Sequence, residues 1–286
     1  MAHAMTVRDR TDLCPGVFRP WPAEDGGLVR LRPTGGLLPS RALVDLVGVA
    51  EAYGDGRVHL TSRANVQLRA LPLEDGAVPG EVVDAIEATG LLPSRSHELV
   101  RNIMVSPQSG FWAGRVDLRP LADELDRLLC ADPRLAGLPG RFLFVLDDGR
   151  GDLLDRTLDL GVVGVSPAAV QLRLGSEHWG AMVPVARAAA ELVALAHVFL
   201  DARGEGPEAP WHVDELGAPL EPPCERYWGI GAEQPPLPDG EVPGGVHHVV
   251  ADGAVDRALA ETVAAAKDVV VVTPWRGLFV PDRVRQ

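Results

Sequence analysis

Polar side chains recur at every second position in the segment TSRANVQLR, residues 61–69. If this segment is a strand, Asn65, Gln67 and Arg69 lie on one face, because side chains alternate along a strand. Arg63 stands just before them. Burying such a face without partners costs free energy, so it must contact solvent or a polar ligand. Guanidinium groups suit carboxylates, so Arg63 is a candidate for binding an anionic ligand. Taken alone, Arg63 is better explained as a turn arginine in water.

Three further arginines stand at the ends of expected strands. Arg101 and Asn102 follow SHELV, Arg141 begins an apolar strand after a Leu-Pro-Gly turn, and Arg276 lies in TPWRG. Taken alone, Arg101 is a weak signal, because arginines are common in loops, and Arg141 is equally typical of a strand-edge charge in solvent.

The segment DDGRGD, residues 147–152, brings three carboxylates and two glycines into one turn. Its spacing differs from that of an EF-hand, and we interpret it as a solvated turn. The sequence holds neither a G-x-x-x-x-G-K-[ST] phosphate loop nor a strand–GxGxxG–helix unit. We predict no metal site from these motifs.

The composition of the chain argues against several classes of function. The formal net charge of −13 argues against a general nucleic-acid binder, because an acidic chain repels the phosphate backbone. Cys14, Cys130 and Cys224 form no C-x-x-C pair, which argues against a zinc site and for a reducing compartment. The first residues have no apolar run, and the longest apolar helix, near 183–200, contains charged residues. We therefore expect a cytoplasmic protein with no nucleic-acid or membrane partner.

Turn signals divide the chain into three groups of elements. Residues 12–80 and residues 222–286 each indicate strand, helix and further strands, and residues 95–205 indicate an α/β unit between them. The outer groups repeat one order: an alternating strand, a glycine turn, an Ala/Val-rich helix, and a strand that enters a threonine–arginine loop. The repeat depends on the order of elements, because the identity is low. We expect Arg276 to be the pseudo-symmetric counterpart of Arg63.

The combination of these motifs resembles the nitrite and sulfite reductase family. LVRLRPTGGLL…GRVHLTSRANVQLRAL is similar to that family's ferredoxin-like half-domain, whose strand enters a T-x-R-x-x-x-Q loop, here Thr61, Arg63 and Gln67. VRNIMVSPQSG resembles the start of the next domain, and LADELDRLLCADPRLAGLPGRFLFVLDDGRGD resembles the helix and strand that follow. CPGVFRPWPAEDGGLVRLRPTGG and TPWRGLFVPD resemble the precorrin-3B synthase branch most closely.

This resemblance implies an α+β fold, with two pseudo-symmetric ferredoxin-like half-domains flanking the middle α/β domain. It also implies that a siroheme- or precorrin-type tetrapyrrole binds between the halves. By motif position, Arg63, Arg101 and Arg141 would hold ring carboxylates and the small species on the distal face, as candidate catalytic residues. The candidate cofactor-binding residues are Arg63, Asn65, Gln67, Arg69, Asn102 and Arg276.

The motif that contains Arg141 bears on which reaction the site would support. In sulfite reductases the corresponding strand carries two basic residues one apart, whereas this sequence has Arg141-Phe142-Leu143. The apolar second position favours an oxygen-handling or non-reducing pocket over reduction of sulfite or nitrite.

The family also carries a [4Fe–4S] cluster on four cysteines, spaced C-x5-C and C-x3-C, in a domain after the TPWRG segment. This sequence ends at VPDRVRQ, and its three cysteines match none of those positions. One hypothesis is therefore a precorrin-3B synthase-like oxidoreductase of cobalamin biosynthesis that works with an electron-donor protein or a separate cluster-bearing subunit. A second is a non-catalytic tetrapyrrole-binding or partner protein that has lost the cluster. A third is the truncated N-terminal part of a longer enzyme.

Overall fold

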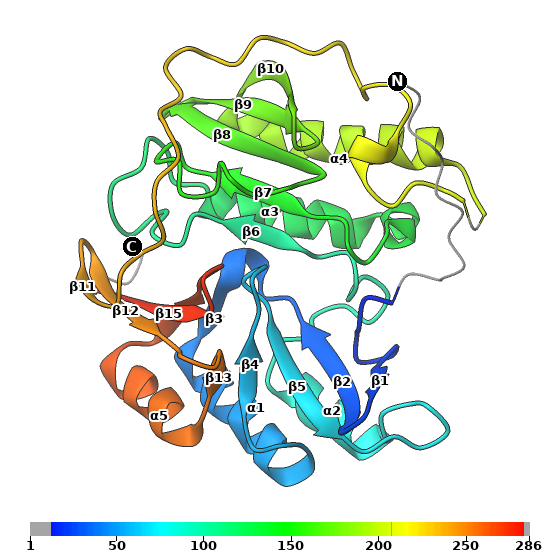
Figure 1. Cartoon of the computed structure of the whole chain (residues 1–286), viewed down its shortest axis with the longest axis vertical. Helices are drawn as coiled ribbons and strands as arrows, with labels where there is room; N and C mark the ends of the chain where they lie inside the picture. The colour runs from blue at the N-terminus through cyan, green and yellow to red at the C-terminus, as the bar shows by residue number, and fades with distance from the viewer. Residues whose placement is uncertain (1–12, 207, 283–286) are drawn as a thin grey trace.

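The structure is a computed structural model in which residues 13–206 and 208–282 are described. Figure 1 shows two bodies stacked along the long axis, with the first and last thirds of the chain together in one body and the middle of the chain in the other. The α+β fold expected from the sequence, with two similar half-domains and a middle domain, is confirmed.

The first half-domain is an antiparallel sheet backed by two helices. Its strands, in spatial order, are β1 (Trp21–Ala23), β2 (Gly26–Leu31), β5 (Val66–Leu71), β4 (Val58–Leu60) and β13 (Ala254–Val255). Helices α1 (Ser40–Tyr53) and α2 (Gly80–Ala88) cover one face. The alternation along β2 and β5 explains this packing, because Val29, Leu31, Val66 and Leu68 are buried against the helices and the residues between them are not.

The second half-domain repeats this arrangement. Its strands, in spatial order, are β11 (Gly240–Val242), β12 (Gly245–Val249), β15 (Gly277–Pro281), β14 (Val269–Val272) and β3 (Leu37–Pro39). Helix α5 (Arg257–Ala266) begins after Asp256, whose carboxylate accepts the Leu259 N–H at 2.9 Å. The two strand orders correspond position by position, which supports the repeat expected from the sequence.

The two half-domains exchange their edge strands. Strand β3, from the first half of the repeat, pairs with β14 of the second, and β13, from the second, pairs with β4 of the first. Helices α1 and α5 pack together, and one apolar core contains Leu43 and Val66 as well as Val263 and Val270. The two halves therefore share one core and form a single folded body.

The middle domain is a mixed sheet with helices on one face. Its strands, in spatial order, are β10 (His178–Pro184), β9 (Ala169–Leu174), β8 (Leu160–Ser166), β7 (Phe144–Asp147) and β6 (Ile103–Val105), and its helices are α3 (Arg119–Ala131) and α4 (Val185–Arg203). Strands β6, β7 and β8 are parallel and the other pairs are antiparallel. Short 3-10 helices cover Thr34–Gly36 (η1), Pro133–Gly137 (η2) and Val213–Glu215 (η3).

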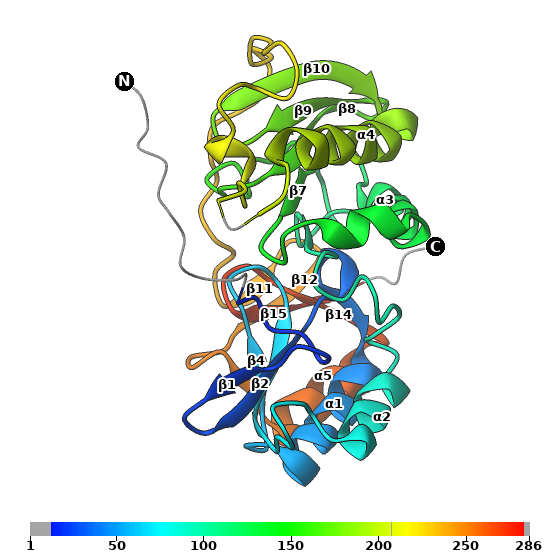
Figure 2. The ribbon, with the colours of Figure 1, turned by 90° about the vertical axis from the view of Figure 1, so that its right-hand side faces the viewer.

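The chain returns to the second half-domain along the middle sheet (Figures 1 and 2). The Cys224 N–H donates to the Trp179 carbonyl at 2.7 Å, and the Gln171 side chain binds the backbone of Glu225 and Tyr227, each at 2.8 Å. The first part of segment 222–286, which the sequence groups with the second half-domain, therefore contacts the middle domain.

A buried guanidinium joins the two bodies at the start of α3. Arg119 is 2% exposed and donates to the Gly35 carbonyl at 2.6 Å and the Pro107 carbonyl at 3.0 Å. Gly35 has a φ of 59°, and a Cβ atom there would lie 2.7 Å from Arg119 Nη1. The turn of η1 thus needs a glycine both for its left-handed backbone and for the approach of the arginine.

The DDGRGD segment is buried, so the interpretation as a solvated turn is wrong. The Asp147 carboxylate accepts the N–H groups of Gly149, Gly151 and Leu153 at 2.8 to 3.0 Å, and Asp148 pairs with Arg150 at 2.7 Å. These bonds fold the loop back on the end of β7. The carboxylates of the loop accept its own N–H groups, and its glycines allow the tight backbone. No group of three or more potential metal ligands is found among the described residues.

Asp152 in this loop is a buried carboxyl with a raised pKa. One of its oxygens accepts the Ser106 hydroxyl at 2.6 Å, while Oδ2 is buried without a hydrogen-bond partner. Burial, followed by the charge of Asp147, raises its pKa to about 7.

We predict that Arg119→Lys lowers the free energy of unfolding by about 2 to 4 kcal/mol, because an ammonium cannot reproduce the guanidinium fork and leaves buried carbonyls unpaired. Urea denaturation measures the change. Arg127→Lys on the same helix is the matched control, since Arg127 forms an exposed pair with Glu124, and its stability should stay unchanged. Equal stability of the two variants would contradict the role of Arg119.

A second prediction concerns pH. The unfolded chain ionises Asp152 near pH 4, whereas the folded chain holds the proton to about pH 7, so rising pH between these values favours the unfolded state. Asp152→Asn cannot ionise. The stability of the variant relative to the natural protein should therefore increase by about 1 to 3 kcal/mol from pH 5 to pH 7, measured by urea denaturation at each pH. A difference that stays constant with pH would refute the raised pKa of Asp152.

Candidate functional site

One face of the first sheet has no helix against it in the described chain. Helices α1 and α2 lie behind this sheet in Figure 1, and the opposite face carries the polar side chains that alternate with the core residues. Arg30 on β2 donates to Gln67 Oε1 on β5 from Nε at 3.0 Å and from Nη2 at 2.6 Å. Arg69, two residues further along β5, pairs with Asp25 at 3.2 Å near the turn between β1 and β2. Gln67 and Arg69 thus share a face, as the alternation predicts.

Two of the predicted catalytic arginines meet at the end of this face nearest the middle domain. Arg63 Nη1 donates to the Arg141 carbonyl at 2.7 Å, which joins the loop between β4 and β5 to the segment before β7. The Arg141 guanidinium makes no hydrogen bond or ion pair with any residue in 13–206 or 208–282, and it is half-buried. A half-buried cation without a carboxylate partner is suited to an anionic ligand.

Asn65 and Asn102 position this pair. Both are buried, and Asn65 Nδ2 donates to Asn102 Oδ1 at 3.1 Å. Arg32 Nε donates to the same oxygen at 2.9 Å, while Asn102 Nδ2 donates to the Gly140 carbonyl at 2.8 Å, next to Arg141. Asn102 therefore holds the Arg141 segment in place, and Asn65 is bonded to Asn102.

Arg101, the other predicted catalytic residue, lies inside the protein. It is 4% exposed and forms a two-fold ion pair with Asp126 on α3, at 2.6 and 2.8 Å. Its Nη2 also donates to the Thr34 hydroxyl at 3.1 Å. The structure thus places the Arg101 guanidinium in the junction of the two bodies, apart from the Arg63–Arg141 pair.

The expected equivalence of Arg276 and Arg63 is wrong by one residue. The Thr61 N–H donates to the carbonyl of Asn65, and the Thr273 N–H donates to the carbonyl of Gly277, both at 2.9 Å. Counting from these threonines, Arg276 corresponds to Ala64, and both have left-handed backbones, with φ values of 57° and 55°. The counterpart of Arg63 is therefore Trp275. The two arginines occupy successive positions of equivalent turns, and Arg276 is exposed.

His212 belongs to the same neighbourhood, although its position in the Pro- and Gly-rich connection gave no sign of it. It precedes η3, and its Nδ1 accepts the Asp214 N–H at 3.1 Å. Its Nε2 lies 3.8 Å from Oδ1 of the fully buried Asp159. Burial lowers the pKa of His212, and the charges of Arg141 and Arg63 lower it further.

The charge of this region is opposite in sign to the net charge of the chain. Burial lowers the pKa of Arg32 to about 10, and the neighbouring Arg30 lowers it as well. Burial also raises the pKa of the two nearby carboxyls, Glu98 and Asp159, in the latter case to about 7. Arg30, Arg32, Arg63 and Arg141 lie close together here, so a chain with a net charge of −13 contains a local cluster of positive charge.

The cysteines do not form a cluster site. All three are free: Cys14 lies close to Arg30 and Arg32, Cys130 is on α3, and Cys224 pairs with β10 through its backbone. Cluster ligation needs several thiolates that converge on one point. The described residues therefore do not fit a [4Fe–4S] cluster.

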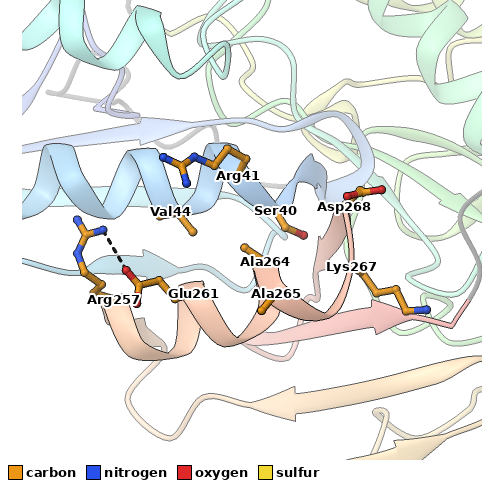
Figure 3. Close-up of a pocket in the computed structure, with 9 residues that line it drawn as sticks. All are labelled: Ser40, Arg41, Val44, Arg257, Glu261, Ala264, Ala265, Lys267 and Asp268. Atoms are coloured by element: carbon orange, nitrogen blue, oxygen red, sulfur yellow. Dashed lines mark ion pairs between the residues drawn. The ribbon is translucent and has the colours of Figure 1, made fainter.

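A separate surface hollow lies away from this site. It has a volume of about 520 Å³ and lies between α1 and α5 (Figure 3). Its charges are largely paired within the protein, since Arg257 contacts Glu51 and Glu261, and Lys267 donates to the Asp282 carbonyl. None of the predicted site residues lines it, so it does not alter the assignment above.

Comparison with known proteins identifies the first half-domain. Residues 21–77 match the family described as the nitrite/sulfite reductase ferredoxin-like half domain. A ferredoxin–nitrite reductase of Synechococcus elongatus is 31% identical over 159 residues, which cover 53% of this chain and 30% of that protein. A precorrin-3B synthase of Sinorhizobium sp is 33% identical over 147 residues, which cover 49% of this chain and 29% of that protein.

The whole fold is similar to a solved structure. The NirA protein of Mycobacterium tuberculosis superposes with a TM-score of 0.65 at 20% identity, over 90% of this chain and 54% of that one. Residues 21–77 thus match the ferredoxin-like half domain of nitrite and sulfite reductases, and the resemblance of the motifs to that family is confirmed. The matched segment spans less than a third of the curated relatives. No helix among the described residues is long and apolar enough to cross a membrane.

Proposed function

We propose that this chain binds a carboxylate-bearing tetrapyrrole, of the siroheme or precorrin type, against the open polar face of its first sheet. The observation that carries the proposal is the half-buried Arg141 guanidinium, which has no partner in the described chain and lies beside Arg63. Tetrapyrroles of this kind are flat and carry several carboxylates, so a sheet face edged by guanidinium groups complements both their shape and their charge.

Different residues of this face would contact different parts of the ligand. Arg63 and Arg141 would hold one ring carboxylate at the end nearest the middle domain. Arg30, together with Gln67, and Arg69 near the opposite end of β5 would face the rest of the ring. When bound, the tetrapyrrole supplies the reactive centre, and the chain orients it through these contacts.

We assign the activity to an oxidoreductase related to precorrin-3B synthase in preference to a sulfite or nitrite reductase. Leu143, at the position where sulfite reductases carry a second basic residue, is buried in an apolar cluster with Met104, Val145, Leu153 and Leu158. One positive charge on this strand is therefore missing, and with it part of the field that would hold a small anion such as sulfite or nitrite. The chain is similar to a precorrin-3B synthase and to ferredoxin–nitrite reductases to about the same extent, so the choice depends on Leu143.

A second candidate is a tetrapyrrole-binding protein without redox activity of its own. The separated positions of the three cysteines favour it, since the described residues do not fit a cluster. In the enzymatic proposal, electrons come from a donor protein or from a cluster-bearing partner subunit. Turnover of precorrin-3A by the purified chain with oxygen and a reductant would eliminate the second candidate.

We predict that Arg141→Ala weakens the binding of siroheme by about 2 to 5 kcal/mol, because the ligand carboxylate would stay buried without its cation. Absorption titration of the purified chain measures the affinity. Arg134→Ala is the matched control, since Arg134 pairs with Asp201 on the surface of the middle domain, and it should bind like the natural protein. A loss below about 0.5 kcal/mol in Arg141→Ala is the value expected of a solvated arginine and would refute the site.

A further inference from the structure

His212 and Asp159 lie directly beside the two arginines of the proposed ligand site, yet they come from other parts of the chain. His212 stands before η3, in the connection that follows α4, and Asp159 lies just before β8. The His212 side chain is 16% exposed, whereas that of Asp159 has no exposed surface. The imidazole is therefore the member of the pair that can meet solvent or a ligand.

Asp159 connects the histidine to the arginine segment. Its Oδ2 accepts the Leu143 N–H at 2.8 Å, two residues after Arg141. Its Oδ1 accepts the Val213 N–H at 3.0 Å, one residue after His212. The Asp159 side chain thus holds both the backbone next to Arg141 and the backbone next to His212. These bonds fix the position of the two residues relative to each other.

We propose that His212 and Asp159 form the proton-exchanging pair of the tetrapyrrole site, so that binding of a ring carboxylate at Arg63 and Arg141 draws one proton from solvent onto His212. The inference rests on the proposed function, since it assigns a role at the same site. It adds the group through which protons reach the ligand, in a region whose other cations are arginines that do not release protons.

The contacts define where the proton goes. In the neutral imidazole, Nδ1 accepts the Asp214 N–H, so the ring proton is on Nε2, which faces Asp159. The incoming proton binds Nδ1, whose nearest acceptor is then Asp214 Oδ2 at 3.3 Å. The Asp214 N–H loses its acceptor in this step, and the ion pair with the Asp214 carboxylate replaces that bond.

Charges from every neighbouring segment act on His212. Asp214 and Glu215 on η3 favour its protonation, whereas Arg141 and Arg63 oppose it. The Asp159 carboxyl, whose own pKa is raised by burial to about 7, faces its Nε2. A bound carboxylate would neutralise the two arginines and remove that opposition. The pKa of His212, lowered by burial in the free protein, should therefore rise when the ligand binds.

The test is the pH dependence of binding by the full chain, with a metal-free, carboxylate-rich porphyrin as the probe. Fluorescence titrations between pH 6 and pH 8.5 give the affinity. For the natural protein the affinity should rise as pH falls, by at most about tenfold per pH unit for the uptake of one proton. His212→Gln retains a polar side chain but cannot exchange the proton, so it should bind at pH 8 with nearly natural affinity and show little rise at lower pH.

His197→Gln is the matched control, because His197 also pairs with an aspartate, Asp132 at 2.9 Å, but on α4 away from the site. It should keep the natural pH dependence. A natural pH dependence in His212→Gln would overturn the inference and leave the proposed function standing. Failure of the natural protein to bind at any pH would overturn the proposed function itself.

A second measurement does not depend on the variants folding. NMR titration of the imidazole C–H signals of the natural protein gives the pKa of each histidine with and without the porphyrin. The His212 signal should titrate at higher pH in the complex, while the His197 signal should not move. An unchanged pKa of His212 in a saturated complex would overturn the inference.

Discussion

The contact between the two bodies depends on guanidinium groups that are buried and must stay hydrogen-bonded. Arg32 donates to the carbonyls of Pro15, Arg30 and Glu98 and to the side chain of Asn102, so one residue joins the N-terminal segment, the first sheet and the middle domain. A buried cation left without acceptors would cost several kcal/mol, so these carbonyls cannot move independently of one another. The ligand site inherits this rigidity, because Asn102 also binds the Gly140 carbonyl beside Arg141.

Arginines of similar local sequence have different roles in this structure, and the difference lies in partners that are remote along the chain. Arg101 meets Asp126, Arg69 meets Asp25, and Arg141 meets no acid in the described chain. Periodicity placed Gln67 and Arg69 on one face, because that property belongs to a single strand. Periodicity could not show whether an arginine forms an ion pair within the protein, because the partner depends on which helix or turn packs against it. For the same reason His212, in a segment without periodicity, had no recognisable signal.

The fold was more accessible to sequence reasoning than the site. The helices at Ser40–Tyr53 and Arg119–Ala131 and the strand at Phe144–Asp147 follow from local hydrophobic patterns. The buried DDGRGD loop does not, because its carboxylates are satisfied by N–H groups of its own backbone rather than by water. The register of the repeat could not be predicted from residue identities alone either. The turns after Thr61 and Thr273 share hydrogen bonds and backbone angles, and these fix the correspondence of Ala64 with Arg276.

The exchange of β3 and β13 also sets the order in which the protein can fold. During synthesis, β3 and the free edge of β4 emerge early, but their partners β14 and β13 are made only after the whole middle domain. Until then the first half-domain exposes two unpaired strand edges and an incomplete core, which are sites for association with other chains. The middle domain can pair all of its own strands in the meantime. The nascent chain must therefore protect its first third until its last third arrives, and closing this contact between distant segments is the slow step that topology predicts.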